Sequence, residues 1–128
     1  MSGQGIVIRN AHFPGRAGID AYGNGGFRFA GMSHRGDLLC LPSGIYGWTG
    51  TQPLTEEALE RVFEEAAEIE ILLVGTGPDL VPLPPPLRQH LREASIIVDV
   101  MNTGAAVRTF NVLLAEERAV AAALFAVD

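Results

Sequence analysis

Apolar and polar positions divide this chain into two parts with different patterns. In the first part, short apolar runs are separated by glycine-rich turns, which predicts strands at 6–8, 27–29, 37–41 and 45–48. Gly-Asn-Gly-Gly at 23–26 is a strong signal for a turn between two extended segments. The first part is therefore expected to contain antiparallel strands that are joined by hairpins.

Helical spacing begins after Pro53 and predicts a helix over 55–67. Thr55 can accept a hydrogen bond from a free backbone amide, and the two glutamates that follow it suit the positive end of a helix. The apolar face of this helix consists of Leu59, Val62, Phe63 and Ala66. We expect that face to be buried and the glutamate-rich face to meet water.

Two nearly continuous apolar runs, 69–74 and 96–100, predict strands that are covered on both faces. Between them, the proline-rich segment 82–86 favours an extended path and leads into a short helix that ends at Glu93. A strand, a helix and a second strand in this order form a right-handed crossover with parallel strands. Both crossover strands are expected to be internal to the sheet.

A further helix, 103–115, is apolar almost all the way round and precedes a last strand at 120–127. At 100° per residue, one narrow stripe of this helix carries the polar or small residues Gly104, Arg108, Asn111 and Ala115. The whole pattern predicts an α/β fold with a βαβ crossover and a small antiparallel β addition from the N-terminal half. The length of 128 residues favours a single domain over 1–128.

Composition excludes several classes of partner. The net charge is −6, and the basic residues are nine scattered arginines without a lysine, so nucleic acid and anionic lipid are poor partners. We expect no signal peptide, because no basic region followed by an apolar segment begins the sequence, and no transmembrane segment, because the longest apolar stretch is too short to span a bilayer. A lone cysteine, Cys40, is expected to be buried and reduced, and the protein to be cytoplasmic.

The loops that follow the two crossover strands contain the clearest candidate chemistry. Gly75-Thr76-Gly77 is not a dinucleotide fingerprint, because prolines rather than a helix follow it. The turn from Met101 to Gly104 starts a helix, whose free amides together with Arg108 could hold an anion. In the alternative interpretation, Asn102 only caps the helix and Arg108 is solvated. The two loops are expected to lie side by side.

Other polar side chains give weaker signals. Asp99 lies in a strand predicted to be buried, so its carboxylate needs a partner, which could be Arg108, a backbone amide or solvent. His12, His34 and His90 belong to different elements and lack a neighbour at metal-ligand spacing. We therefore expect no metal site, no cofactor and no catalytic group.

The chain resembles a small domain family of unknown function that includes the mitochondrial complex I assembly factor 3 and stand-alone bacterial and archaeal members. The resemblance covers roughly Ile6 to Phe125. It rests on the segments Asp20-Ala-Tyr-Gly-Asn-Gly-Gly-Phe-Arg-Phe, Gly36-Asp-Leu-Leu, Ile71-Leu-Leu-Val-Gly-Thr-Gly and Val100-Met-Asn-Thr-Gly-Ala-Ala-Val-Arg-Thr-Phe-Asn-Val-Leu-Leu-Ala-Glu-Glu-Arg-Ala-Val-Ala-Ala-Ala-Leu.

This resemblance implies a mixed central sheet with helices on one side and a small flanking sheet, in a three-layer β+β/α arrangement. It implies no established enzymatic activity. The mitochondrial members act as assembly factors that bind a second assembly factor, and bacterial members are linked to the protein-export machinery. The chain departs from the family at Asn102, where an aspartate is usual, and at Val107, where a cysteine is frequent. Capping survives the first change, since asparagine and aspartate cap helices about equally well.

The leading hypothesis is therefore a soluble, non-enzymatic accessory protein that binds another protein in the assembly or biogenesis of a membrane complex. The alternative is a small-molecule or anion-binding domain, or an enzyme, that uses the loops 75–77 and 101–104 with Arg108. A purely structural domain and a homo-oligomer also remain open. The candidate residues for a ligand or partner are Gly75, Thr76, Gly77, Asn102, Thr103, Gly104, Arg108 and Asn111. A bound anion would favour the alternative, and an exposed apolar patch would favour protein binding.

Overall fold

The structure is a computed structural model that describes residues 12–128, so the strand predicted at 6–8 lies outside the described residues. The elements follow in the order β1 (His12–Pro14), β2 (Ala21–Gly23), β3 (Gly26–Phe29), β4 (Met32–Arg35), β5 (Asp37–Leu41), β6 (Gly44–Trp48), η1 (Glu57–Leu59), α2 (Glu60–Glu64), η2 (Ala66–Glu68), β7 (Ile71–Gly75), α3 (Pro85–Glu93), β8 (Ile97–Met101), α4 (Thr103–Ala115) and β9 (Val120–Leu124).

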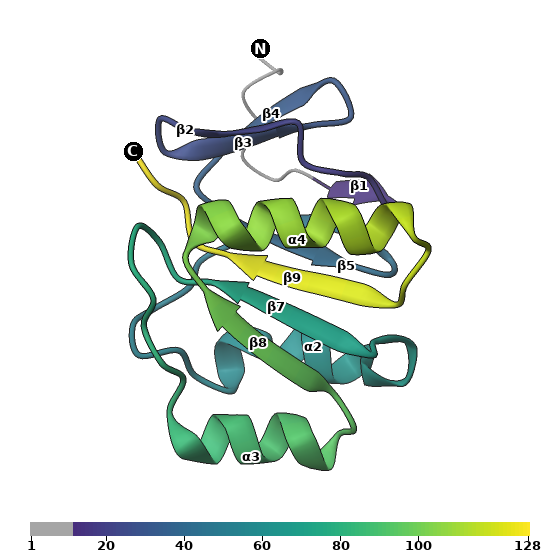
Figure 1. The fold of residues 1–128 in the computed structure, drawn as a ribbon, viewed down its shortest axis with the longest axis vertical. Helices are drawn as coiled ribbons and strands as arrows, with labels where there is room; N and C mark the ends of the chain where they lie inside the picture. Colours follow the sequence, from purple (N-terminus) through teal and green to yellow (C-terminus); the bar gives the residue numbers. More distant parts are fainter. Residues whose placement is uncertain (1–11) are drawn as a thin grey trace.

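Within residues 12–128, the strands form one large mixed sheet and one small antiparallel sheet (Figure 1). The large sheet has the order β1-β6-β5-β9-β7-β8, and the small sheet has the order β2-β3-β4. β7 is parallel to both β8 and β9, whereas β5 is antiparallel to β9. The predicted α/β class, the parallel crossover and the small antiparallel addition are confirmed.

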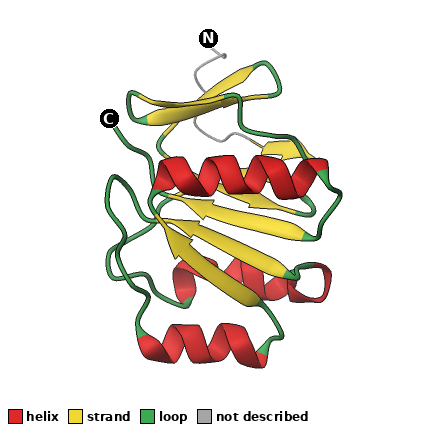
Figure 2. Ribbon diagram, viewed as in Figure 1, coloured by secondary structure: helices red, strands yellow, loops and turns green. Residues whose placement is uncertain are grey.

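Side chains of the central strands alternate between two buried layers. Along β5, Leu38 and Cys40 face one layer, and Leu39 and Leu41 face the other. One layer lies under η1, α2 and α3, and the other lies under α4 and the small sheet. Figure 2 shows α4 in front of the large sheet and α2 behind it.

The expected placement of all helices on one side of the sheet is therefore wrong. From β7 the chain passes through α3 to β8 at the edge, and from β8 it returns through α4 to β9 on the other side of β7. The two crossovers run in opposite directions along the sheet. Right-handed connections that run in opposite directions place their helices on opposite faces.

The expectation that β8 is internal and covered on both faces is also wrong. Among residues 12–128, β8 pairs only with β7, and Ile97 is 61% exposed. Val98 and Val100 pack against the core layer under α3, whereas α4 lies mainly over β7 and β9. On the other face of β8, Met101 packs against the layer under α4, but Asp99 is exposed and needs no buried partner.

The helix predicted over 55–67 is broken into the short pieces η1, α2 and η2. Leu59 and Val62 are buried as expected, and the Thr55 Oγ1 accepts a hydrogen bond from the Ala58 amide at 3.1 Å. The Trp48 side chain donates a 2.7 Å hydrogen bond to the Ala58 carbonyl, which a continuous helix would bond internally. This tertiary contact competes with helical pairing at the first break.

The hairpins of the N-terminal half are divided between the two sheets. β2 and β3 flank the predicted turn, in which Asn24 and Gly25 have φ values of 53° and 79°, as a tight hairpin requires. β4 was not predicted, because Met32–Arg35 lacks a clear apolar alternation. β5 and β6 join the large sheet, and the last strand ends at Leu124 instead of 127.

Cys40 lies in the middle of β5 and is buried, as predicted. Burial removes the solvation that a thiolate needs and raises the pKa of the Cys40 thiol from 9.0 to about 12. The thiol therefore belongs to the core of the large sheet.

Candidate functional site

The two loops singled out in the sequence lie side by side at one edge of the large sheet. Gly75 and Met101 are the last residues of the parallel strands β7 and β8 and are paired in register. Beyond them, the Thr76 amide donates a 2.9 Å hydrogen bond to the Met101 carbonyl. This hydrogen bond joins the segment after β7 to the turn before α4.

Gly77 and Thr103 tie these loops together through reciprocal hydrogen bonds. The Gly77 amide donates to the Thr103 Oγ1 at 2.9 Å, and the Thr103 amide donates to the Gly77 carbonyl at 2.8 Å. The Thr103 hydroxyl in turn donates to the Phe125 carbonyl at 2.7 Å and is fully buried. Its hydrogen-bonding capacity is therefore used inside the protein.

Thr76 organises the loop that follows β7. Its hydroxyl donates to the Asp79 carbonyl at 2.6 Å and accepts from the Val81 amide at 3.0 Å. Thr76 itself is 6% exposed. These hydrogen bonds fix the conformation of the loop 76–81, in which residues 78–81 are exposed to solvent.

Gly75 allows the N-terminus of α4 to approach the end of β7. A Cβ at this position would lie 3.0 Å from the Ala106 Cβ, from a Leu124 methyl carbon and from the Thr103 Cα. Those distances are shorter than ordinary carbon contacts, so a side chain there would force the helix away from the sheet.

Asn102 caps α4, as predicted. Its extended backbone (φ −68°, ψ 162°) places the Oδ1 atom 2.8 Å from the Ala105 amide. The Ala105 amide is thus bonded to Asn102 and the Thr103 amide to Gly77, which leaves fewer donors for an anion than the sequence suggested.

The polar stripe of α4 faces the small sheet and the segment that leads into it. Asn111 donates from Nδ2 to the Ile19 carbonyl and accepts at Oδ1 from the Ile19 amide, both at 2.8 Å. At the start of the helix, the Tyr22 hydroxyl lies against Gly104 at the place where a Cβ would project. Residues 18–22 therefore dock on this stripe of α4, a role that the sequence analysis did not predict.

Arg108 is the exposed exception on this stripe. Its Nη1 atom lies 3.5 Å from the position that a Cβ on Gly104 would occupy, so the guanidinium runs along the start of the helix. Among the residues that the structure describes, no acidic group forms an ion pair with Arg108, Asp99 included. Within residues 12–128, the guanidinium is therefore exposed and without an ion pair.

Three exposed apolar side chains surround these loops and were missed as a group. Tyr22 is 41% exposed, Leu80 is 57% exposed and Val81 is 36% exposed. A hint existed in the sequence, because Leu80 and Val81 stand in a short loop between prolines. We call the group Tyr22, Leu80, Val81, Asn102 and Arg108 the strand-end surface.

Contacts between neighbouring segments connect the parts of the strand-end surface into one region. Tyr22 touches Gly104, Gly77 bonds to Thr103, and the Gly25 amide donates to the Val127 carbonyl at 2.8 Å. In Figure 1, the β2–β3 turn, the start of α4 and the loop after β7 all lie at the same side of the molecule.

The histidines whose side chains are described lie outside this surface. A nitrogen of buried His34 lies 3.0 Å from the Asp37 carbonyl, and His90 stacks on Phe63 and contacts the Glu56 carboxylate at 3.1 Å. The side chain of His12 lies outside the description. Within the described part of the chain, no helix is both long enough and apolar enough to span a membrane.

Known proteins resemble this chain over most of its length. Residues 19–125 match the family described as a protein of unknown function (DUF498/DUF598). An uncharacterized protein of Rhodobacter capsulatus is 40% identical over 119 residues, which cover 93% of this chain and 92% of that protein.

A mouse protein is 35% identical over 93% of this chain and is named NADH dehydrogenase [ubiquinone] 1 alpha subcomplex assembly factor 3. The match covers 65% of the mouse protein, so the chain spans slightly less than two thirds of that relative. A Bartonella henselae crystal structure, described as an outer membrane protein, superposes with a TM-score of 0.89. It is 66% identical, and the match covers 91% of this chain and 100% of that chain.

Proposed function

Because the chain belongs to the DUF498/DUF598 family, whose relatives include assembly factors of NADH dehydrogenase, we propose that it assists the assembly of a membrane complex. It does so by binding another protein through the strand-end surface. The assembly role is supported by the names of its relatives. The choice of surface is supported by the side chains of this chain.

The observation that carries the choice of surface is a set of exposed apolar side chains on a rigid base. Tyr22, Leu80 and Val81 present apolar area to solvent, and Arg108, which lies near Gly104 as Tyr22 does, has no acidic partner among the described residues. Tyrosine and arginine are enriched at protein interfaces, where they supply much of the binding energy. The hydrogen bonds of Thr76 and Thr103 hold the base in place, which lowers the entropy lost on binding.

An anion or small-molecule site at the same loops has less support. Such a site needs several free donors that converge on one point. The Thr76 and Thr103 hydroxyls and the amides of Gly77, Thr103 and Ala105 are already bonded within the chain. Arg108 remains as a donor, and one exposed guanidinium holds an anion weakly in water.

Site-specific photo-crosslinking in the organism that encodes the chain tests the proposal. A photoreactive residue at Leu80 or Tyr22 should crosslink to the same protein, identified by mass spectrometry as an assembly factor or a subunit of a membrane complex. The matched control places the photoreactive residue at exposed Arg92 on α3, away from the strand-end surface. Equal crosslinking from Arg92, or crosslinks to unrelated proteins, would contradict the proposed surface.

Complementation of a gene deletion tests the assembly role separately. Deletion should lower the amount of fully assembled NADH dehydrogenase on native gels, and the intact chain should restore it. Leu80→Asp combined with Arg108→Glu should fail to restore assembly although the protein is folded. Normal assembly in the deletion strain would refute the role.

A further inference from the structure

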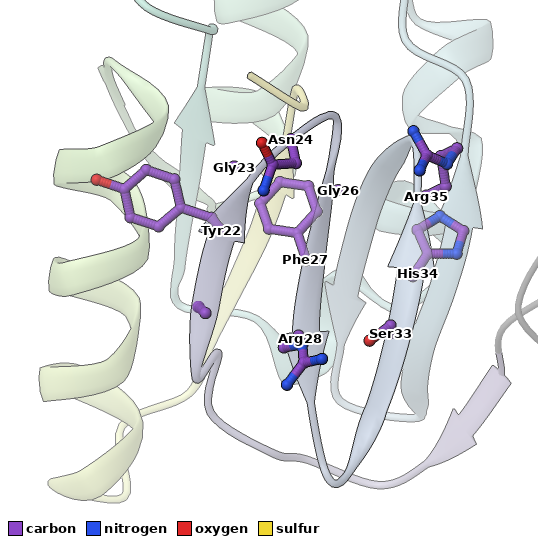
Figure 3. Close-up of a pocket in the computed structure, with 10 residues that line it drawn as sticks. Tyr22, Gly23, Asn24, Gly26, Phe27, Arg28, Ser33, His34 and Arg35 are labelled. Atoms are coloured by element: carbon purple, nitrogen blue, oxygen red, sulfur yellow. The ribbon is translucent and has the colours of Figure 1, made fainter. Parts of the chain in front are cut away.

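A hollow lies on the small sheet, away from the loops 75–77 and 101–104. It has a volume of about 400 Å³ and is lined by residues of all three strands of that sheet in the described part (Figure 3). Its lining includes Ala21, Gly23, Gly26, Arg28, Ser33 and Arg35. Tyr22 belongs to the strand-end surface and also lines this hollow, so the two adjoin and a single partner can contact both.

The register of the small sheet places two arginines on its outer face. Phe27 and Phe29 point into the core, so Arg28 between them points outward. Arg28 pairs with Ser33, and Arg35 is two residues further along β4. Arg28 and Arg35 are therefore diagonal neighbours on one face, with Cα atoms about 7–8 Å apart.

Neither arginine forms an ion pair within residues 12–128. Among the described residues, the ion pairs involve His90 with Glu56 and Arg118 with Glu70. The carboxylate nearest to β4 in sequence, Asp37, accepts hydrogen bonds from the amides of Gly50 and Ala126 instead. Arg28 and Arg35 therefore place two positive charges on one small sheet of a chain whose net charge is −6.

The remaining residues of the outer face are small. Ala21 pairs with Arg28, and Gly23 pairs with Gly26. The positions of β2 and β3 that surround the two arginines on this face therefore carry no bulky side chain. An extended backbone can therefore lie close to the sheet, and the Ser33 hydroxyl adds a polar group beside Arg28. A broad, shallow, cationic face of this kind suits a flexible anionic chain.

We propose that this hollow binds an extended acidic segment of the partner protein, with two carboxylates separated by one residue. In an extended chain, side chains two positions apart point the same way and start about 6.6–6.8 Å apart, close to the diagonal Cα spacing of Arg28 and Arg35. The Arg35 Nη1 atom lies 3.6 Å from the position of a Cβ on Gly25 in the β2–β3 turn, so this guanidinium turns toward Arg28 when the second carboxylate binds. Each guanidinium can donate two hydrogen bonds to a carboxylate. This inference rests on the proposed function, because it takes the acidic segment to belong to the protein that the chain binds.

Titration of the isotope-labelled protein with short blocked peptides, followed by NMR, tests this directly. The probe is acetyl-Thr-Glu-Thr-Glu-Thr-amide. One control peptide replaces both glutamates with glutamine, and another places them side by side so that they point to opposite faces. The probe should shift the signals of residues 21–28 and 33–35 and bind about tenfold more tightly than either control.

Charge-matched variants complete the test. Arg28→Gln with Arg35→Gln should weaken the probe about tenfold or more, while Arg88→Gln with Arg92→Gln on α3 should leave its affinity unchanged. Equal loss in both double variants, equal affinity for all three peptides, or inorganic phosphate binding as tightly as the probe would overturn the inference.

The outcome is separable from the fate of the proposed function. If the probe fails to bind but crosslinking from Leu80 still captures a complex subunit, only the acidic-segment inference fails. If crosslinking finds no specific partner while the probe binds as described, the proposed assembly surface fails and the cationic hollow stands.

Discussion

At the scale of single residues, several polar groups of the candidate site hold the protein's own parts together. Thr103 joins α4 to the loop after β7 and to the segment after β9, and Asn111 fastens Ile19 to α4. Buried or partly buried polar groups are costly unless they are bonded, so each of these contacts adds specificity to the fold. The side chains that stay exposed for a partner are chiefly those of the strand-end surface.

Replacement of Asn111 tests the docking role of the polar stripe. Asn111→Ala removes two hydrogen bonds and leaves the amide and carbonyl of Ile19 without those partners, so it should lower the free energy of unfolding by about 2 kcal/mol. Arg108→Ala on the same stripe is the control and should cost less than about 0.5 kcal/mol. Urea unfolding measures both, and equal costs would contradict the docking role.

The cap of α4 gives a second prediction at this scale. Asn102→Ala removes the acceptor of the Ala105 amide and should cost about 1 kcal/mol, while Asn102→Asp should be nearly neutral. Thermal unfolding of the two variants checks this. A large cost for the aspartate would show that the amide nitrogen of Asn102 has a role beyond capping.

The buried thiol predicts a defined dependence on pH. The pKa of Cys40 is about 12 in the folded protein and 9.0 when exposed. Between pH 9.0 and 12 the unfolded chain loses this proton and the folded protein keeps it, so the free energy of unfolding falls as the pH rises. The slope should be steeper by about 1.4 kcal/mol per pH unit than in Cys40→Ala.

Urea unfolding at several alkaline pH values measures that slope. At neutral pH, a thiol reagent should react slowly with the native protein and quickly in denaturant. Identical alkaline slopes in the two proteins, or fast labelling of the native state, would show that the thiol is not buried.

At the scale of elements, β8 is the exposed side of the parallel crossover. Ile97, Asp99 and Met101 bond to β7, whereas the amides of Val98 and Val100 point away from it, as the pairing register of parallel strands requires. An edge strand of this kind is held by one neighbour only, and its outer amides meet solvent.

Amide hydrogen exchange should therefore be faster in β8 than in β7. Val98 and Val100 should exchange at least tenfold faster than Leu73, which lies in β7 between β8 and β9. NMR exchange on the isolated protein measures the rates. Slow exchange at Val98 and Val100 would mean that another strand or a second copy covers this edge.

At the scale of the whole molecule, α4 connects the two sheets. Its buried residues Ala106, Val107 and Phe110 share one core layer with β3, β5, β7 and β9. The small sheet cannot detach without exposing that layer, because Phe27 and Phe29 are part of it.

We therefore expect both sheets to unfold together in one cooperative transition. The single tryptophan, Trp48, packs on the opposite core layer and reports on the large sheet. Its fluorescence, circular dichroism and the NMR signals of Phe27 should give the same midpoint in urea. An earlier loss of the Phe27 signals would mean that the small sheet is an independent unit.

Sequence pattern alone determined most elements and the adjacency of the two loops. Strand, turn and capping signals are local, so the β2–β3 hairpin, the start of α4 at Asn102 and the parallel pairing of β7 with β8 could be predicted. The buried position of Cys40 followed from the apolar residues around it.

Tertiary structure alone decided which surfaces stay open. An apolar run such as 96–100 has the same pattern in the middle of a sheet as at an edge with one covered face, and strand order distinguishes the two cases. The stripe on α4 likewise could not be assigned, because the backbone of Ile19 that it binds is 92 residues away. Local patterns show which side chains can be buried, but contacts between distant segments determine which are, and therefore what is left to meet a partner.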